Sequence, residues 1–217
     1  MKITNAKDTV DWYNKNAHKY KEASDKAFSK NDLDQLNEFG KLIAPKSKVL
    51  DVGCGSGRDS NLMTQKGFNL TGLDISSGLI NLAKKSYPNI KFVLGDMTQL
   101  PFSNEKFDGI WSHASLLHLE TVEAVKKALS EFYRVLRPKG ILHVLVKAQT
   151  TSQKTAIVKD KLSKHDRFFQ FFKLDELKKL LEMSGFTIIH IEQYNETKNN
   201  PDGRQEVDWI VSLSSKG

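Results

Sequence analysis

The 217-residue sequence contains a single cysteine, Cys54, and no long apolar run. One thiol cannot form a disulfide within the chain, so a reducing compartment presents no difficulty for folding. No stretch reaches the roughly 18 consecutive apolar residues that predict a membrane-spanning helix. Residues 1–8 also lack the apolar segment of a secretion signal. We therefore expect a cytoplasmic protein that does not contact membranes.

Ligand spacing for a metal ion is also missing. The six histidines show no pattern such as H-E-x-x-H, and one thiol without a partner motif makes a poor metal site. Cys54 does follow a glycine at the expected start of a helix, where a thiol can be activated. Without a second catalytic motif beside it, we expect neither a metal centre nor a cysteine nucleophile.

The composition is typical of one globular domain. Hydrophobic residues make up 39% of the chain and charged residues 27%, and a single α/β domain often reaches this length. The net charge of +7 permits an anionic partner, RNA included. No nucleic-acid-binding module accompanies that charge, and lysines scattered over the surface explain it without a partner.

Strand-like apolar runs alternate with segments of helical spacing, which predicts a parallel sheet with helices on both faces. Helical spacing occurs over 79–83, 122–136 and 174–181. Strands are expected over 48–52, 69–74, 91–95, 107–112, 141–147, 187–194 and 207–212.

The most specific signal is the run Val49-Leu50-Asp51-Val52-Gly53-Cys54-Gly55-Ser56-Gly57-Arg58. Alternating glycines after a strand allow a tight turn that brings bare backbone N–H groups against a ligand at a helix N-terminus. A dinucleotide-binding turn would have a third glycine where Arg58 stands, and the lysine of a phosphate loop is absent. The glycines alone could also serve a plain strand-to-helix turn.

The pattern D-x-G-x-G-x-G, with Asp74 ending the next strand, resembles the class I S-adenosylmethionine-dependent methyltransferases. Further segments resemble that family in the same order along the chain: Ile90–Met97, Phe107–Ser112, Ser112–His118 and Arg134–Leu142. The resemblance implies a doubly wound, Rossmann-like α/β fold with a seven-stranded, mostly parallel sheet. It also implies that the last strand is antiparallel and that the cosubstrate is S-adenosyl-L-methionine.

The resemblance assigns roles around the glycine turn. Asp74 would accept hydrogen bonds from the two ribose hydroxyls, with a helix cap before Ser76 as the alternative. Asp51 would lie near the amino-acid end of the cosubstrate, or simply be capped by nearby N–H groups. Arg58 would pair bidentately with the methionyl carboxylate, or lie solvated on the first helical turn. Gly53, Gly55 and Gly57 would form the turn itself.

Other positions are implied to surround the base and the methyl group. Asp96 would accept from the adenine amino group, the Met97 backbone would contact the ring, and Ile75 would pack on it. A capping acid and two core side chains are the alternatives. His113 is implied to line the cofactor pocket beside Ser112.

Two further segments are predicted to cover the site. Trp12, Tyr13, Ala17 and Tyr20 are expected on one N-terminal helix that resembles the family's Y-x-x-x-A-x-x-Y helix closing over the cosubstrate. A short amphipathic helix that buries its aromatic residues explains the same pattern. His118 is the candidate general base, because histidine has a suitable pKa and the loop after the fourth strand faces the methyl group in the family. A structural histidine packed near Leu116 and Leu117 is the alternative.

We expect one methyltransferase domain over 1–217, with a helical cap at 1–40 and a cofactor-binding core at 41–147. A substrate lid at 148–173 and a C-terminal helix and strand pair at 174–217 complete it. The lid is unusually long for such a connection. Its phenylalanines would form walls around an acceptor, and its basic residues could attract an anion. The phenylalanines are Phe168, Phe169, Phe171 and Phe172, and the basic residues are Lys154, Lys159, Lys161, Lys164 and Arg167.

The predicted function is methyl transfer by in-line displacement to an oxygen or nitrogen of a small, possibly anionic molecule. Methylation of RNA or protein stays open as an alternative. A nonenzymatic protein that binds S-adenosylmethionine is a third hypothesis, which the intact motif set argues against. The sequence does not define an oligomeric state.

Overall fold

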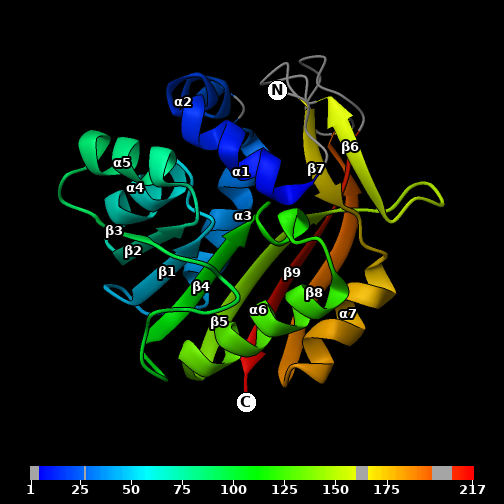
Figure 1. Ribbon diagram of the computed structural model, residues 1–217. Helices are drawn as coiled ribbons and strands as arrows, with labels where there is room; N and C mark the ends of the chain where they lie inside the picture. The colour runs from blue at the N-terminus through cyan, green and yellow to red at the C-terminus, as the bar shows by residue number, and fades with distance from the viewer. Residues whose placement is uncertain (1–4, 27, 160–165, 197–206) are drawn as a thin grey trace.

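The computed structural model describes residues 5–26, 28–159, 166–196 and 207–217, and these form one central sheet flanked by helices (Figure 1). The strand order is β3-β2-β1-β4-β5-β9-β8. Strands β1 to β5 pair in parallel, whereas β9 runs antiparallel between β5 and β8. This confirms the predicted fold and its antiparallel last strand. The bounds are β1 Lys48–Val52, β2 Asn69–Asp74, β3 Lys91–Leu94, β4 Phe107–His113, β5 Leu136–Lys147, β8 Phe186–Asn195 and β9 Asp208–Lys216.

Helices cover both faces of the sheet, and two more lie across its carboxyl edge (Figure 1). Their bounds are α1 Ala6–Lys15, α2 Ala17–Lys26, α3 Lys30–Lys41, α4 Arg58–Gln65, α5 Ser77–Ser86, α6 Val122–Val135 and α7 Leu174–Met183, with a short 3₁₀ helix η1 at Leu116–His118. None of the helices within the described ranges has the length and apolar character that crossing a bilayer requires.

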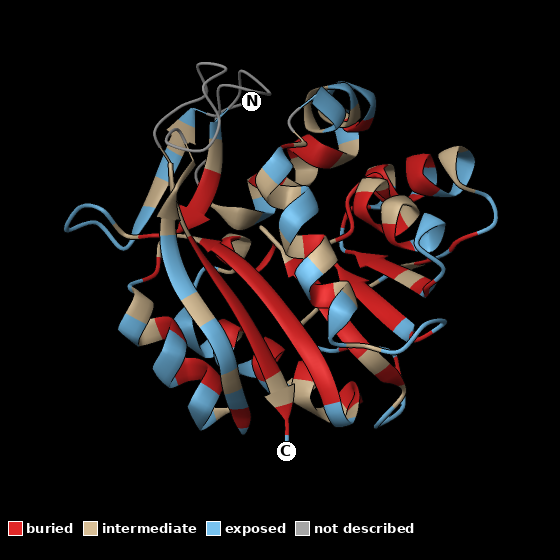
Figure 2. Ribbon diagram, turned by 180° about the vertical axis from the view of Figure 1, so that it is seen from behind, coloured by how far each residue is buried: buried red, intermediate tan, exposed pale blue. Residues whose placement is uncertain are grey.

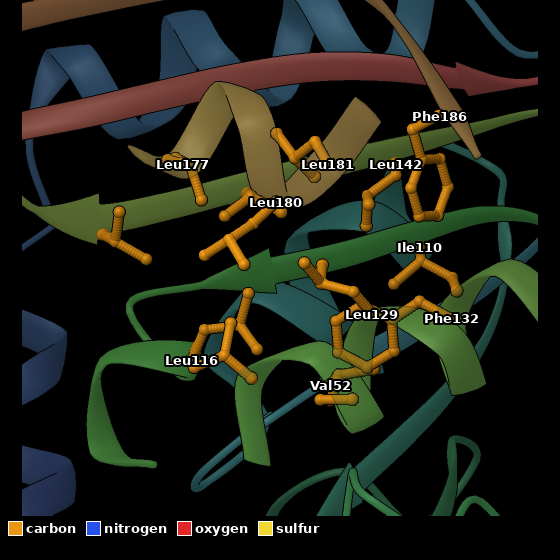
Figure 3. Packing of buried hydrophobic residues seen from close by; sticks show 14 of the residues in the cluster. Val52, Ile110, Leu116, Leu129, Phe132, Leu142, Leu177, Leu180, Leu181 and Phe186 are labelled. Carbon is orange, nitrogen blue, oxygen red and sulfur yellow. The ribbon is translucent and has the colours of Figure 1, made fainter. Parts of the chain in front are cut away.

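One core lies between the sheet and helices α6 and α7. Ile110 and Leu142 point from neighbouring strands toward Leu129 and Phe132 of α6 and Leu181 of α7 (Figure 3). All five side chains are fully buried. Burying a large aliphatic or aromatic side chain contributes about 1.5–3 kcal/mol, so this layer fixes the sheet on which the site is built. Most residues of the central strands are buried (Figure 2).

A second core lies on the opposite face of the sheet, because side chains on a strand alternate between the two faces. Val49 and Trp111, each next to a residue of the first core, face α3 and α4 instead. There they pack with Leu36 and Phe39 of α3 and Met63 of α4, all fully buried. Helix α3 therefore packs on a face of the sheet, although it falls almost entirely within the predicted cap at 1–40. That division of the chain stays a prediction.

Most element boundaries lie close to the prediction, with two informative exceptions. Strand β9 extends to Lys216 rather than to residue 212, because it pairs along its whole length with β8. Strand β5 begins at Leu136 rather than at Ile141, because Leu136 already pairs with Phe107 before an irregularity in the ladder. Lys139 in that irregularity has φ of 64°, a conformation that favours glycine.

The segment 148–173 contains a hairpin that the prediction missed. Strands β6 (Thr155–Lys159) and β7 (Asp166–Gln170) pair antiparallel in a separate two-stranded sheet beside the end of α1 (Figure 1). The expectation that the phenylalanine cluster lines a cavity is wrong for most of its members. Of the four phenylalanines, only Phe169 lines the cavity. Phe172 is buried in the core between the sheet and helices α6 and α7.

The prediction of one N-terminal helix through Trp12 and Tyr20 is also wrong. Helix α1 ends at Asn16, where both the backbone N–H and the side-chain amide donate to the carbonyl oxygen of Trp12 (3.0 and 2.9 Å). The backbone of Asn16 has φ of −124° and ψ of 27°, outside the helical region, so the chain leaves the helix there. Helix α2 begins at Ala17 after the break.

Candidate active site

A cavity of about 930 Å³ opens at the carboxyl edge of the parallel strands. This is the edge at which open α/β sheets bind ligands. Twelve of the fourteen predicted site residues line it. They are Tyr13, Tyr20, Asp51, Gly53, Gly55, Arg58, Asp74, Ile75, Asp96, Met97, His113 and His118.

Gly57 and Ser112 do not line the cavity. Gly57 has φ of 86° at the start of α4, and a Cβ there would meet the Phe92 ring at 2.7 Å. Its role is therefore to let the helix begin against the sheet. Ser112 is buried, with its hydroxyl 2.8 Å from that of Ser115. Ser112 lies between Trp111 and His113 on β4. Neighbouring side chains on a strand point to opposite faces, so Ser112 points away from the face that those two rings share.

Three backbone N–H groups of the glycine turn donate hydrogen bonds to the end of β2, two to a carbonyl oxygen and one to a side chain. The N–H groups of Gly53 and Cys54 donate to the carbonyl of Leu73 (2.7 and 3.0 Å), and the N–H of Gly55 donates to Asp74 Oδ2 (2.9 Å). Gly53 has φ of 73°, and a Cβ there would lie 2.3 Å from the Cβ of Ser115. Only glycine fits this approach, so the turn and the loop after β4 are in direct contact.

Asp74 lies at the cavity wall with both oxygens held in place. Oδ1 accepts from the N–H of Ser76 at 2.8 Å, and Oδ2 accepts from Gly55. The α5 helix is capped by Ser76, whose hydroxyl accepts from the N–H of Leu79, so Asp74 is not the cap. Burial raises the pKa of Asp74 despite these N–H donors. Each carboxylate oxygen has a second acceptor position, which fits a vicinal diol.

A pair of buried carboxylates lies under the turn. Asp51 accepts from the hydroxyl of Ser60 at 2.6 Å, and Asp59 accepts from the indole N–H of Trp111 at 3.1 Å. Burial and the charge of Asp59 raise the pKa of Asp51 to about 7. Burial also opposes ionisation of Asp59, but Arg58, His113 and the indole N–H of Trp111 together outweigh it and lower the pKa of Asp59. Of the two carboxyl groups, Asp51 is therefore the one that binds a proton more readily.

Arg58 makes contacts that neither interpretation of the sequence included. Its Nε donates to Asp59 at 2.7 Å, its Nη1 donates to the carbonyl of Ser24 at 2.7 Å, and the guanidinium lies 4.9 Å from the centre of the Phe28 ring. The side chain is 21% exposed, so it is not a solvated residue of the first helical turn. Pairing with a methionyl carboxylate stays a prediction.

His113 belongs to a stack of three rings. Its imidazole lies parallel to Trp111 at 5.2 Å, and His143 lies on Trp111 at 3.7 Å. His113 Nε2 is 3.3 Å from Asp32 Oδ1. Burial disfavours the charged ring, but Asp32 raises the pKa of His113. In return, His113 lowers the pKa of Asp32 to about 2 against the effect of burial.

The predicted base-binding residues gather at the ends of β2 and β3. Ile75 is 51% exposed although it is apolar, and it faces the cavity. An aliphatic side chain left open in this way suits a planar base. Asp96 lies beside it on the cavity wall, and its Oδ1 accepts from the N–H and hydroxyl of Thr98 (2.7 and 2.9 Å). Met97 lines the same wall.

Tyr13 and His118 close the cavity from two directions. The Tyr13 hydroxyl lies 3.4 Å from His118 Nε2, and its ring packs edge-on against Tyr20 at 4.8 Å. His118 Nδ1 lies 2.9 Å from the carbonyl oxygen of Phe168. A carbonyl can only accept, so Nδ1 carries the hydrogen and Nε2 is the basic nitrogen of the neutral ring. The ring packs on Phe169 at 5.2 Å.

Cys54 lacks the setting of a nucleophile. Burial and the nearby Asp51 and Asp74 carboxylates raise the pKa of its thiol well above the usual value, so the reactive thiolate is disfavoured. Within the described part of the chain, no group of three or more histidine, cysteine, aspartate and glutamate side chains could hold a metal ion.

Several cavity residues were not predicted as site residues. Asp59 and Asp32 complete the buried charges near the turn, and Lys147 and Trp209 line the cavity at the ends of β5 and β9. Asp59 directly follows Arg58 and Lys147 ends a predicted strand, so both had a local signal. Asp32 and Trp209 reach the site only through the packing of α3 and the return of β9, which no local pattern indicates.

Residues 50–144 match a family profile described as a methyltransferase domain. The demethylmenaquinone methyltransferase of Renibacterium salmoninarum is 38% identical over 100 residues, which are 46% of this chain and 41% of that protein. Over this stretch the chain is similar to methyltransferases. The chain spans about half the length of the curated relatives it matches, from 41% to 56% for the first three.

Solved structures share the fold of this chain. A Methanosarcina mazei S-adenosylmethionine-dependent methyltransferase aligns with a TM-score of 0.73 at 20% identity, covering 82% of this chain and 95% of that one. The 1,6-didemethyltoxoflavin-N1-methyltransferase of Burkholderia thailandensis, solved with its substrate and S-adenosylhomocysteine, aligns with a TM-score of 0.66 at 18% identity. That alignment covers 100% of this chain and 92% of the other.

Proposed function

We propose that this methyltransferase transfers a methyl group from S-adenosyl-L-methionine to an oxygen or nitrogen atom of a small molecule. The observation that carries the proposal is the Asp74 carboxylate at the cavity wall, fixed by the N–H groups of Gly55 and Ser76. With acceptor positions left on both oxygens, it suits a ribose diol. Ile75 offers an apolar surface for the base beside it.

The enclosure of the cavity favours a small acceptor over RNA or protein. Helix α1 is bonded to strand β7 by the hydroxyl of Thr9, which accepts from the N–H of Phe168 at 3.1 Å, and by the Arg167 contact to Tyr13 at 2.8 Å. A volume of about 930 Å³ lies within the roughly 300–1,000 Å³ range of small-molecule sites. The curated relatives named for quinone, sterol and O-methyl transfer support the same class.

When bound, S-adenosylmethionine supplies an activated methyl group whose carbon–sulfur bond breaks with its electron pair staying on sulfur. The residues of this chain hold the acceptor in line with that bond and exclude water from it, which can contribute on the order of 7 kcal/mol or more. His118 Nε2 accepts the proton that a hydroxyl or ammonium acceptor must lose. The carbonyl of Phe168 keeps that nitrogen unprotonated in the neutral ring.

Calorimetric titration with S-adenosylmethionine tests the cosubstrate site. Wild-type protein should bind in the micromolar range, and Asp74→Ala should remove detectable binding because both ribose acceptor positions are lost. Asp34→Ala is the matched control, since Asp34 is an exposed carboxylate on α3 outside the cavity. Tight binding by Asp74→Ala would contradict the proposed site.

His118→Asn tests the base once an acceptor is found by screening hydroxyl and amine compounds for S-adenosylhomocysteine release. The turnover number should fall by about 10²–10⁴-fold for a hydroxyl acceptor while the affinity for S-adenosylmethionine is retained. The acidic limb of the pH–rate profile, which follows protonation of His118, should disappear. His190→Asn, on the exposed side of β8, should change neither. An unchanged profile in His118→Asn would exclude the proton-accepting role.

A further inference from the structure

The cavity extends beyond the region assigned to the cosubstrate. The predicted ribose and base residues lie at the tips of β2 and β3, whereas Lys147 and Trp209 line the cavity at the ends of β5 and β9. The strand order puts β1 and β4 between β2 and β5. With strands about 4.8 Å apart, roughly 14 Å separates the two regions. The far region is therefore where an acceptor has room.

Two cations in that region are fixed on one aromatic ring. Lys147 Nζ lies 3.8 Å from the centre of the Phe169 ring, and the guanidinium carbon of Arg167 lies 5.2 Å from it. Lys147 Nζ is also 5.7 Å from the centre of the Trp209 ring. Such contacts are attractive and restrict long, flexible side chains. Both cations are half-buried and line the cavity.

The same cations lie next to the proposed base. Arg167 Nη1 donates to the Tyr13 hydroxyl at 2.8 Å, and that hydroxyl is 3.4 Å from His118 Nε2. Arg167 Nη1 is therefore two hydrogen bonds from the nitrogen that would accept the acceptor's proton, and a group bound at Arg167 lies one hydrogen bond further away. This spacing fits a small molecule that carries its anion and its nucleophile on one compact frame.

Acidic side chains also line this end, but each accepts from the protein. Glu120 Oε1 accepts from the N–H of Ala6 at 2.6 Å, and Glu196 Oε2 accepts from the indole N–H of Trp209 at 2.9 Å. Both carboxylates thus hold α1 and β9 at the rim of the cavity. The exposed Lys7 adds a third cation to the lining.

We propose that Lys147 and Arg167 form an anion-recognition subsite, and that the methyl acceptor is a small aromatic carboxylate bound there by its carboxylate group. Arginine presents a planar fork that matches a carboxylate bidentately, and lysine adds a point charge beside it. Leu145, Leu117 and Trp209 supply apolar wall for an aromatic frame. The proposal rests on the proposed methyl transfer, since the subsite is assigned to the acceptor of that reaction.

The test uses protein saturated with S-adenosylhomocysteine and a library of hydroxybenzoates and aminobenzoates, each paired with its neutral primary amide. Calorimetry measures both members of every pair. At least one carboxylate should bind about tenfold more tightly than its amide, which corresponds to about 1.4 kcal/mol. That preference should disappear in Lys147→Met and Arg167→Met, which keep the length of the side chain and remove the charge.

Lys154→Met is the matched control, because Lys154 precedes the same hairpin but pairs with Glu176 at the surface. It should keep the full preference for the carboxylate. The subsite is refuted if no pair favours the carboxylate, or if the preference survives in both cavity variants. Binding of S-adenosylhomocysteine, measured first in every variant, separates the two proposals. Its loss in wild type would refute the proposed function, whereas retained binding without a charge preference would refute the subsite alone.

Discussion

Replacing Asp51 with asparagine should stabilise the protein without ligand at neutral and alkaline pH. Burial and the Asp59 charge raise the pKa of Asp51 to about 7 in the folded protein, whereas an unfolded chain gives about 3.9. Between these values the folded protein binds more protons than the unfolded chain, so the free energy of unfolding falls as pH rises. A shift of about three units at about 1.4 kcal/mol each costs the folded state about 4 kcal/mol above pH 7.

Asparagine has the shape of the protonated carboxyl group, and its carbonyl oxygen can still accept from the Ser60 hydroxyl that now donates at 2.6 Å. The difference in unfolding free energy between variant and wild type should therefore be near zero at about pH 4. It should grow through the interval up to pH 7 and level at about 4 kcal/mol at pH 8. For a chain of this length, that difference raises Tm by roughly 10 °C.

Urea unfolding of both proteins at several pH values measures this difference directly. Subtracting the wild-type curve removes the contributions of other titrating groups, such as His113 and Asp32, that both proteins share. A variant that is no more stable at pH 8, or a gain that is the same at every pH, would refute the buried, proton-binding state of Asp51. We also expect Asp51→Asn to weaken S-adenosylmethionine binding, a loss of function that accompanies many stabilising changes.

Two other changes test the turn and the ring stack. Gly53→Ala should lower the free energy of unfolding by about 3 kcal/mol in thermal or urea melts, because it adds left-handed strain and a 2.3 Å contact with Ser115. Gly67→Ala, with φ of 89° and open space around its Cβ, should cost only about 1 kcal/mol, and equal losses would contradict the clash. Asp32→Asn should lower the pKa of His113, which Asp32 raises, in an NMR titration of the ring. In wild type, the stabilisation from the Asp32–His113 pair is present below pH 6.5 and is lost as pH rises through the His113 pKa. If the free energy of unfolding of Asp32→Asn had the same pH dependence as that of wild type, the ion pair would be excluded.

Sequence patterns were sufficient to predict the site residues that lie close to one another along the chain. The strand before Gly53, the turn itself and Asp74 lie within the 27 residues from Lys48 to Asp74 in the parallel core, and their positions follow from the spacing of glycines and acids. The antiparallel last strand, which lies as β9 between β5 and β8, was predicted from the resemblance to the family, because periodicity carries no information about which strands pair.

The N-terminal helices and the hairpin were mispredicted for different reasons. The break at Asn16 is a change of backbone conformation, to φ of −124° and ψ of 27°, within a helical pattern that otherwise continues. Strand β7 is held by α1, since the N–H of Phe168 donates to Thr9, a residue 159 positions earlier. Phe172 could not be separated from Phe169 by sequence, because both are apolar and only the docking of the segment decides which faces the cavity.

The two ends of the cavity carry different charges. This difference predicts how binding of one substrate affects binding of the other. The carboxylates of Asp32, Asp59 and Asp74 lie at the end near the glycine turn together with the Arg58 guanidinium, whereas Lys147 and Arg167 lie at the other. The acidic end suits a cosubstrate that carries sulfonium and ammonium charges, and the basic end suits an anion. Because oppositely charged ligands attract over a short, poorly solvated distance, binding of one should strengthen binding of the other, and by thermodynamic linkage the effect is reciprocal. S-adenosylhomocysteine lacks the sulfonium charge, so an aromatic carboxylate should bind more weakly to that complex than to one with S-adenosylmethionine.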